Sequence, residues 1–283
     1  MTSADAAAGR PVVGFLGLGD QGLPMAIAIA EAGFELHVWA RRSASLEALG
    51  ATPHIVEPNP EALAGVSDIV ALCLGTDDDV LALAERMRPS LRSGAVVINH
   101  GTGTPANARR LAELLADRGV DALDAPVSGG RPAAESRRLT TLVGGSAAAL
   151  TRVEPVLRTF ATNIVRLGDA GAGQLAKLFN NALLMMNQAS IADILDLAAD
   201  AGADPVRLVE ALKLGSANSA ALGLFNTMIT ADTVDHLSAV QTFDMEIFDH
   251  ALRESDADPA QVTARGLSGA NRLRRVIDQL ACG

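Results

Sequence analysis

A lysine and two asparagines stand close together in the stretch GAGQLAKLFNNALLMMNQ, which runs from residue 171 to residue 188. The apolar pattern predicts a long helix, so Asn181 lies one turn beyond Lys177 on the same face, with Asn180 beside that line. An ammonium group can donate a proton, and an amide can hydrogen-bond a substrate or orient the lysine. The same stretch also fits a lysine whose stem lies along an apolar surface while the amides tie the helix to a loop. The stretch by itself leaves both interpretations open.

A glycine-rich turn near the N-terminus has the spacing of a dinucleotide-binding loop. It lies directly between the apolar run VVGFL and the amphipathic run LPMAIAIAEAG, and it consists of Gly17, Leu18, Gly19, Asp20, Gln21 and Gly22. Glycines at this spacing permit a tight turn, close approach of the backbone to a pyrophosphate, and close packing of the following helix. A carboxylate is unfavourable beside phosphates, so we expect Asp20 to cap the helix or to point into solvent. The turn predicts a binding site for a nicotinamide dinucleotide.

The end of the second predicted strand indicates which dinucleotide is bound. An NAD site usually places an acidic residue there to hold the 2′-hydroxyl of the ribose. This chain has Arg41, Arg42 and Ser43 instead. Two guanidinium groups and a hydroxyl suit a 2′-phosphate, so we expect NADP(H) to be preferred over NAD(H). The alternative is that both arginines belong to an ordinary solvated strand end.

A third candidate site is the stretch DAPVSGG, from residue 124 to residue 130. The hydroxyl of Ser128 and the backbone N–H groups of Gly129 and Gly130 could hold a carboxylate or another oxyanion. The stretch follows a predicted strand, and ligands of doubly wound folds bind outside the carboxyl ends of the strands. It could also be an ordinary loop.

Alternating strands and helices would position these residues. Buried strands are predicted at 12–16, 34–40, 68–75, 95–101, 121–128 and 139–145, separated by helical segments. Continuous apolar strands alternating with helices indicate an α/β fold, with a doubly wound (Rossmann) parallel sheet covered on both faces. From residue 169 the pattern is helical, with helices near 174–201, 205–214, 219–228, 237–254 and 259–280. We therefore predict a dinucleotide-binding domain at 11–168 and an all-helical domain at 169–283, joined by a long interdomain helix.

Composition restricts the partners. The net charge of −10 and the pI of about 4.9 disfavour binding to nucleic acid or to an anionic membrane, which leaves a small-molecule substrate. Cys73 and Cys282 form neither a disulfide framework nor a metal-ligand pattern, so we expect no bound metal. The lack of a disulfide framework also fits a cytoplasmic location, which we expect. We see no targeting signal and no apolar run that is both long and charge-free enough to span a bilayer. The chain has no tyrosine, which removes that residue as a proton donor.

The three motifs together resemble those of the β-hydroxyacid dehydrogenase family. GFLGLGDQGLPMA, DAPVSGG and GAGQLAKLFNN match the family in order and spacing, and the likeness extends from Val12 to about Leu252. This family includes 3-hydroxyisobutyrate dehydrogenase and the tartronate semialdehyde, glyoxylate and succinic semialdehyde reductases. The resemblance implies an NAD(P)-dependent oxidoreductase that transfers hydride to or from a small aldehyde or ketone.

The resemblance also implies individual roles. Lys177 would be the general acid/base, Ser128, Gly129 and Gly130 would bind the substrate carboxylate, and Asn181 would contact the substrate or orient the lysine. Leu74, Gly75, Thr76 and Thr102 would border the cofactor. His100 also stands at a strand end, where a histidine more often has a structural hydrogen bond than a catalytic role.

The chain departs from the family pattern at several positions. Ala133 and Arg137 occupy glycine positions after DAPVSGG, and Gly101 stands where relatives often have serine. Phe243 replaces a lysine of the helical domain, so we expect it to line a more apolar substrate pocket.

Two other functions remain open. The related imine reductases share the glycine loop, but usually carry aspartate or tyrosine where Lys177 stands, so Lys177 and DAPVSGG favour carbonyl chemistry. A non-catalytic NADP-binding protein would be expected to lose the lysine first. A long apolar helix needs covering on more than one side, so we also expect a homodimer.

Overall fold

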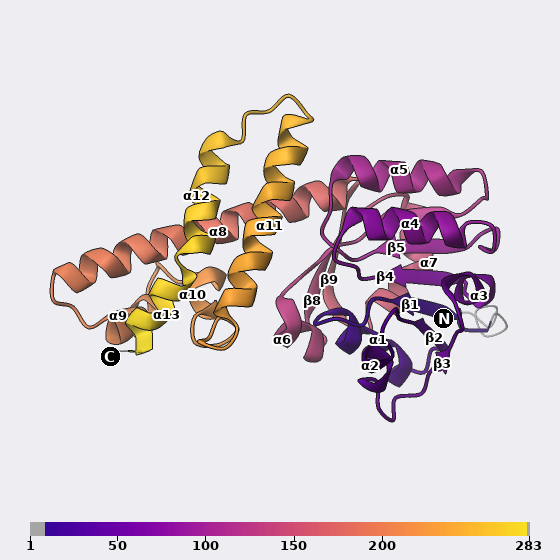
Figure 1. Cartoon of the computed structure of the whole chain (residues 1–283), viewed down its shortest axis with the longest axis horizontal. Coiled ribbons are helices and arrows are strands. Elements are labelled where there is room, and N and C mark those ends of the chain that lie inside the picture. The colour runs from indigo at the N-terminus through magenta and orange to yellow at the C-terminus, as the bar shows by residue number, and fades with distance from the viewer. Residues whose placement is uncertain (1–8, 282–283) are drawn as a thin grey trace. The chain divides into compact units, whose positions relative to one another are not determined.

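The computed structural model describes residues 9–281, and the chain divides into two compact units between Lys177 and Leu178. Unit 1 contains a β-sheet with helices, and unit 2 is built from helices alone (Figure 1). The α/β class and the all-helical second part agree with the sequence prediction. Cys282 and most of the N-terminal segment, on which the predictions about targeting rest, lie outside the described residues.

The sheet of unit 1 has nine strands in the order β3-β2-β1-β4-β5-β6-β8-β7, with β9 paired to β8. The strands are β1 (Val13–Leu16), β2 (Leu36–Trp39), β3 (Ile55–Val56), β4 (Ile69–Leu72), β5 (Val96–Asn99), β6 (Asp121–Asp124), β7 (Val127–Ser128), β8 (Leu139–Gly144) and β9 (Ala161–Gly168). Strand order reverses direction at β1, beside which β2 and β4 both lie parallel. This switch point is where doubly wound folds bind their ligands.

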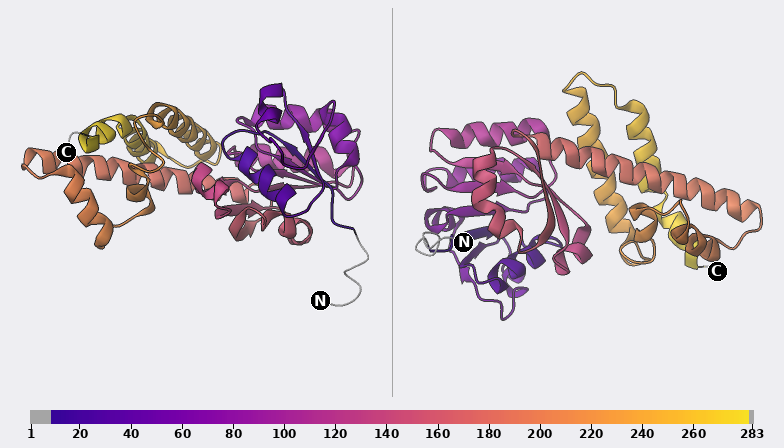
Figure 2. Two further views of the ribbon diagram at one scale, coloured as in Figure 1. Left: turned by 90° about the horizontal axis from the view of Figure 1, so that it is seen from below. Right: turned by 180° about the vertical axis from the view of Figure 1, so that it is seen from behind.

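Helices cover both faces of this sheet (Figure 2). They are α1 (Gly22–Glu31), α2 (Ser43–Glu47), α3 (Pro60–Val66), α4 (Asp77–Met87), α5 (Pro105–Ala116), α6 (Gly130–Glu135) and α7 (Ala147–Leu157). Neighbouring strand residues enter opposite cores: Phe15 packs in the core with Met25 of α1, and Leu16 packs in the core with Leu63 of α3. The strands are therefore continuously apolar because both of their faces are buried.

The sheet differs from the prediction in three respects. β8 runs antiparallel to β6 and β7, so the sheet is dominated by parallel pairs but is not wholly parallel. The predicted strand at 121–128 is two strands, β6 and β7. The short, exposed β3 and the largely exposed β9 were not predicted, because neither has the buried apolar run that identifies the other strands.

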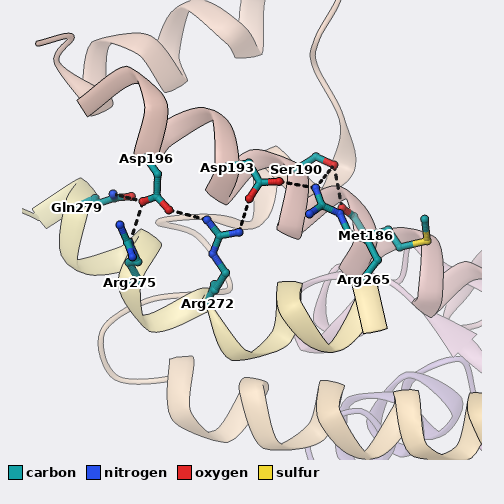
Figure 3. A network of polar contacts seen from close by, with 8 residues as sticks. All are labelled: Met186, Ser190, Asp193, Asp196, Arg265, Arg272, Arg275 and Gln279. Atoms are coloured by element: carbon teal, nitrogen blue, oxygen red, sulfur yellow. Dashed lines mark hydrogen bonds and ion pairs between the residues drawn. The ribbon is translucent and has the colours of Figure 1, made fainter. Parts of the chain in front are cut away.

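Unit 2 consists of the larger part of α8 (Ala172–Asp200) together with α9 (Pro205–Leu214), α10 (Ala220–Leu224), α11 (Val234–Arg253), α12 (Ala260–Asn271) and α13 (Leu273–Ala281). Leu195 of α8 and Ile277 of α13 lie in one buried core, and Met185 of α8 and Phe248 of α11 lie in another. The helix predicted at 259–280 is interrupted at Arg272, which joins an ion-pair network with Asp193 and Asp196 of α8 (Figure 3). The helix predicted at 219–228 is shorter and ends at Leu224.

The long helix α8 is continuous across the division between the units. The first turns of α8 belong to unit 1. The sequence instead places the domain boundary before this helix, between residues 168 and 169, and that boundary stays a prediction. Among the described helices, α8 is long and apolar enough to cross a bilayer by length and composition, so the prediction that no run reaches this limit was wrong. Core helices of water-soluble proteins meet the same criterion, and α8 contributes to both cores of unit 2.

Candidate functional site

The glycine loop between β1 and α1 has the geometry that its sequence predicts. Gly17 has φ +100°, and a Cβ there would lie 2.1 Å from the carbonyl oxygen of Cys73. A Cβ on Gly22 would lie 1.9 Å from the carbonyl oxygen of Gly17, so packing within the protein requires glycine at both positions. A Cβ on Gly19 would meet no atom within 4 Å. Packing within the protein does not require glycine at position 19, and the open space there leaves room for a pyrophosphate to approach the backbone.

The other residues of the loop divide between core and solvent. Leu18 is buried, and Gln21 is the N-cap residue of α1 without a side-chain capping bond. Asp20 is exposed, and its carboxylate lies 3.8 Å from the guanidinium of Arg131 on α6. The expectation that Asp20 points into solvent agrees with this exposure, and Arg131 compensates its charge.

The end of β2 carries the three residues expected to recognise a 2′-phosphate. Arg41, Arg42 and Ser43 are all exposed, and Ser43 begins α2. Arg41 makes a bidentate pair with Asp79 of α4, with N–O distances of 3.0 and 3.2 Å. A carboxylate therefore does reach this strand end, although it comes from a different part of the chain.

The loops after β4 and β5 pack against each other. Thr76 caps α4 by accepting a hydrogen bond from the backbone of Asp79, and Gly75 is exposed. A Cβ on Gly101 would lie 2.5 Å from the carbonyl oxygen of Leu74, so a serine at position 101 would not fit this close packing. Thr102 is partly buried and lies between two glycines that are held by the same side chain, described below.

The turn from Ser128 to Gly130 requires unusual backbone geometry. Gly129 has φ +127° and Gly130 has φ +65°, both in the region that favours glycine. A Cβ on Gly129 would also lie 2.4 Å from the Cβ of Ala133. The partly buried Ser128 ends β7, so its hydroxyl and the following N–H groups lie together in one short segment of the kind that could hold an anion.

Arg137, which stands where the family pattern has glycine, has a backbone conformation that favours glycine. It has φ +57°, which costs a residue with a side chain about 1–2 kcal/mol. Its guanidinium pairs with Glu31 of α1, which offsets part of this cost. The backbone at position 137 is therefore left-handed although the residue there has a long side chain.

Lys177 is buried in the second turn of α8, and the start of this helix is fixed by two buried polar side chains. Asp124, at the end of β6, accepts hydrogen bonds of 2.8 Å from the backbone N–H groups of Gly171 and Gln174. The amide of Gln174 donates to the carbonyl of Gly101 at 2.7 Å and accepts from the N–H of Gly103 at 2.9 Å. The start of the helix that carries the lysine is therefore attached through short hydrogen bonds to the ends of β5 and β6.

Burial dominates the electrostatics of Asp124. It raises the pKa of this carboxyl group, while the N–H groups of Gly171 and Gln174 act in the opposite direction. A Cβ on Gly173 would lie 2.4 Å from the carbonyl oxygen of Leu142, so the helix start packs directly on the sheet. No side chain can be added at this contact without moving the helix.

Two further titratable groups lie at strand ends, the buried His100 and the partly buried Cys73. Nδ1 of His100 donates to the carbonyl of Ala125 at 2.9 Å, and burial lowers the pKa of His100 to about 4. The ring packs edge-on against Phe160. Burial raises the pKa of the Cys73 thiol to about 12, so it stays protonated. The structural interpretation of His100 agrees with these contacts.

The two site residues predicted from unit 2 have different environments. Asn181 is buried, and its amide donates to the carboxylate of Asp244 on α11 at 2.8 Å and accepts from Asn180 at 3.1 Å. Phe243 is exposed on α11. Asn181 therefore has a fixed orientation one helical turn from Lys177, whereas the pocket role of Phe243 stays a prediction.

The sequence did not predict that Asp124 and Gln174 hold the start of α8, although both lie within recognised motifs. A further signal was available in the composition. The chain has 23 lysines and arginines, and only Lys177 and Lys213 are lysines. A buried lysine in a chain that otherwise uses arginine almost everywhere is a signal that draws attention to position 177.

A cavity of about 450 Å³ in unit 1 lies away from these residues. It is lined by α5, the start of β6 and the loop before α8, and includes Ala112, Val120, Asp121 and Ser146. None of the predicted site residues lines it.

Two known protein families match successive parts of the chain. Residues 12–168 match the family described as the NAD binding domain of 6-phosphogluconate dehydrogenase, which covers more than half of the chain. Residues 171–273 match the family described as the NAD-binding domain of NADP-dependent 3-hydroxyisobutyrate dehydrogenase. The chain is also 33% identical to 2-(hydroxymethyl)glutarate dehydrogenase of Eubacterium barkeri, over 74% of this chain and 71% of that protein.

Solved structures with the same fold include both enzyme types considered above. Mycobacterium tuberculosis 3-hydroxyisobutyrate dehydrogenase, determined with L-serine, matches with a TM-score of 0.84 at 25% identity, over 96% of this chain and 99% of that one. An imine reductase from Streptomyces aurantiacus matches with a TM-score of 0.68 at 23% identity, over 95% of each chain. The second likeness extends to the fold alone.

Proposed function

We propose that this chain, which belongs to the β-hydroxyacid dehydrogenase family of NAD(P)-dependent oxidoreductases, transfers hydride between NADPH and a small aldehyde or ketone that carries a carboxylate. The observation that carries this proposal is the buried Lys177 on α8, the helix whose start is fixed to the ends of β5 and β6 by Gln174 and Asp124. The cofactor, when bound, supplies the hydride.

The residues of the cofactor site fit a dinucleotide. The open space at Gly19 and the start of α1 suit a pyrophosphate, and the exposed Arg41, Arg42 and Ser43 suit a 2′-phosphate. The positive charges of Arg41 and Arg42 support a preference for NADP(H) over NAD(H).

Lys177 acts as the general acid in reduction and as the general base in oxidation. In reduction its ammonium group donates a proton to the carbonyl oxygen of the substrate, and in oxidation the neutral amine accepts the hydroxyl proton. Ser128, Gly129 and Gly130 bind the carboxylate through a hydroxyl and backbone N–H groups, which orients the carbonyl. Asn181 orients the lysine or contacts the substrate from the next helical turn.

The test is the rate of NADPH oxidation with a panel of semialdehyde acids, neutral aldehydes and ketones, and cyclic imines. Lys177→Ala should lower turnover of the preferred carbonyl about 10²–10⁴-fold, because general acid–base catalysis contributes that much. Lys213→Ala removes the other lysine and should leave the rate unchanged. Preferential turnover of imines would favour an imine reductase, and NADPH binding without any turnover would favour a non-catalytic protein.

We further propose that a second copy of the chain covers α8 in a homodimer. Four large apolar side chains of α8 in unit 2, Phe179, Leu183, Ile194 and Leu197, are each at least half exposed. They recur at spacings that place them along one side of the helix. Leu197→Glu should convert the dimer to a monomer in sedimentation velocity, and a wild-type monomer would contradict the proposal.

A further inference from the structure

The cofactor end of β2 contains an ion pair that the sequence pattern did not indicate. Nη1 of Arg41 donates to Oδ1 of Asp79 at 3.0 Å, and Nη2 donates to Oδ2 at 3.2 Å. The two residues are 38 positions apart and come from the end of β2 and the first turn of α4. Bidentate pairing of this kind fixes the plane of a guanidinium as well as its position.

The carboxylate of Asp79 is stable where it lies. Its backbone N–H donates to the capping hydroxyl of Thr76, and negative charge is favoured in the first turn of a helix. Asp77, in the same turn, is instead engaged by Thr104 and Asn107. Asp79 is therefore the carboxylate of this turn that binds Arg41, and Arg41 belongs to the proposed 2′-phosphate site.

We propose that Asp79 is a positioning residue for Arg41 and limits how strongly the protein discriminates NADP(H) from NAD(H). This rests on the proposed function, which assigns the 2′-phosphate to Arg41, Arg42 and Ser43. The carboxylate occupies two guanidinium donors and cancels the charge of Arg41, so an arriving phosphate must share or displace it. A dinucleotide without the 2′-phosphate does not need the guanidinium of Arg41, so its binding does not require this ion pair to be shared or broken.

The size of the effect follows from exposure. The side chain of Arg41 is 69% exposed and that of Asp79 is 34% exposed, so the pair can be separated at low cost. Removing the carboxylate should strengthen binding of a 2′-phosphate by about two- to five-fold, the range that corresponds to exposed ion pairs.

The experiment measures binding of 2′,5′-ADP and of 5′-AMP to the full-length chain by isothermal titration calorimetry. These probes differ by the 2′-phosphate and require no knowledge of the substrate. Asp79→Asn should tighten 2′,5′-ADP by the stated factor and leave 5′-AMP unchanged. Asp78→Asn removes the same charge from the same turn without touching the pair, and should change neither affinity.

Arg41→Ala separates the two proposals. It should weaken 2′,5′-ADP, and adding Asp79→Asn to it should then change the affinity less than two-fold, because Asp79 acts through Arg41. Equal effects of Asp78→Asn and Asp79→Asn, or no effect of either, would overturn the positioning role. A wild type that binds both probes equally would contradict the NADP preference, yet a selective gain in Asp79→Asn would still support the role of Asp79.

Discussion

The two halves of helix α8 are held in opposite ways. At its start, in unit 1, a few fully enclosed polar groups make short hydrogen bonds: Asp124 binds the first N–H groups, and Gln174 binds the loop after β5. In unit 2, Asp193 and Asp196 are surrounded by partly exposed arginines of α12, of α13 and of the junction between these helices (Figure 3). The same helix therefore combines a buried anchor with an exposed one.

The difference corresponds to the task of each half. A buried hydrogen-bond acceptor cannot be replaced by water, so losing it costs the full desolvation penalty of its donors. An exposed arginine–carboxylate pair exchanges easily with water and salt. The buried anchor lies beside Lys177, the proposed proton donor, and the exposed anchor lies at least sixteen residues further along the helix.

The largest expected effect is loss of the buried anchor. Asp124→Ala leaves the N–H groups of Gly171 and Gln174 without their acceptor, so we expect the free energy of unfolding to fall by about 2–6 kcal/mol. Urea unfolding followed by circular dichroism measures this. Asp121→Ala, in the same strand but on an exposed ion pair with Arg152, should cost no more than about 1 kcal/mol. Equal losses in the two variants would remove the distinction between buried and exposed contacts.

The buried region should also respond to pH through His100, which directly precedes the loop bound by Gln174. The unfolded histidine takes up a proton near pH 6.5, whereas the folded one does so only near pH 4, so stability is lost as the pH falls through this interval. The shift corresponds to about 3 kcal/mol. His100→Gln keeps a donor for Ala125 and should lose less stability than the wild type between pH 6.5 and pH 4. Parallel pH profiles would contradict the buried, neutral state of His100.

The smallest effect is expected at the exposed anchor. Hydrogen bonds from Arg272 and Arg265 hold the pKa of Asp193 below its ordinary value. Arg272→Ala should lower the free energy of unfolding by about 1 kcal/mol at low salt. The loss should shrink as salt rises to 1 M, where the Debye length is about 3 Å. Arg207→Ala, on a far more exposed pair with Asp204, is the control and should have no measurable effect. A salt-independent loss above about 3 kcal/mol would make the two anchors alike.

The sequence predicted the elements and motifs that rest on local patterns. Apolar runs identified the buried strands, and the spacing of Gly17, Gly19 and Gly22 predicted the loop that the structure contains. The resemblance to the family was correct, because three motifs occur together in order.

Contacts between distant residues could not be predicted in this way. Asp124 and Gln174 are 50 residues apart, and Asp79 approaches Arg41 across 38 residues. No local pattern connects such partners. The antiparallel β8 was missed for a related reason, since an apolar run reveals that a strand is buried but not the direction of its neighbour.

The most direct test of the proposed mechanism is the pH dependence of kcat/KM for carbonyl reduction by NADPH, compared between the wild type and Lys177→Met. Reduction needs a protonated donor, so the wild-type rate should fall at alkaline pH as the lysine loses its proton. The variant should be slower by about 10²–10⁴-fold and should lack that alkaline decline. A variant that retains the wild-type profile would show that another group donates the proton, and would contradict the role assigned to Lys177.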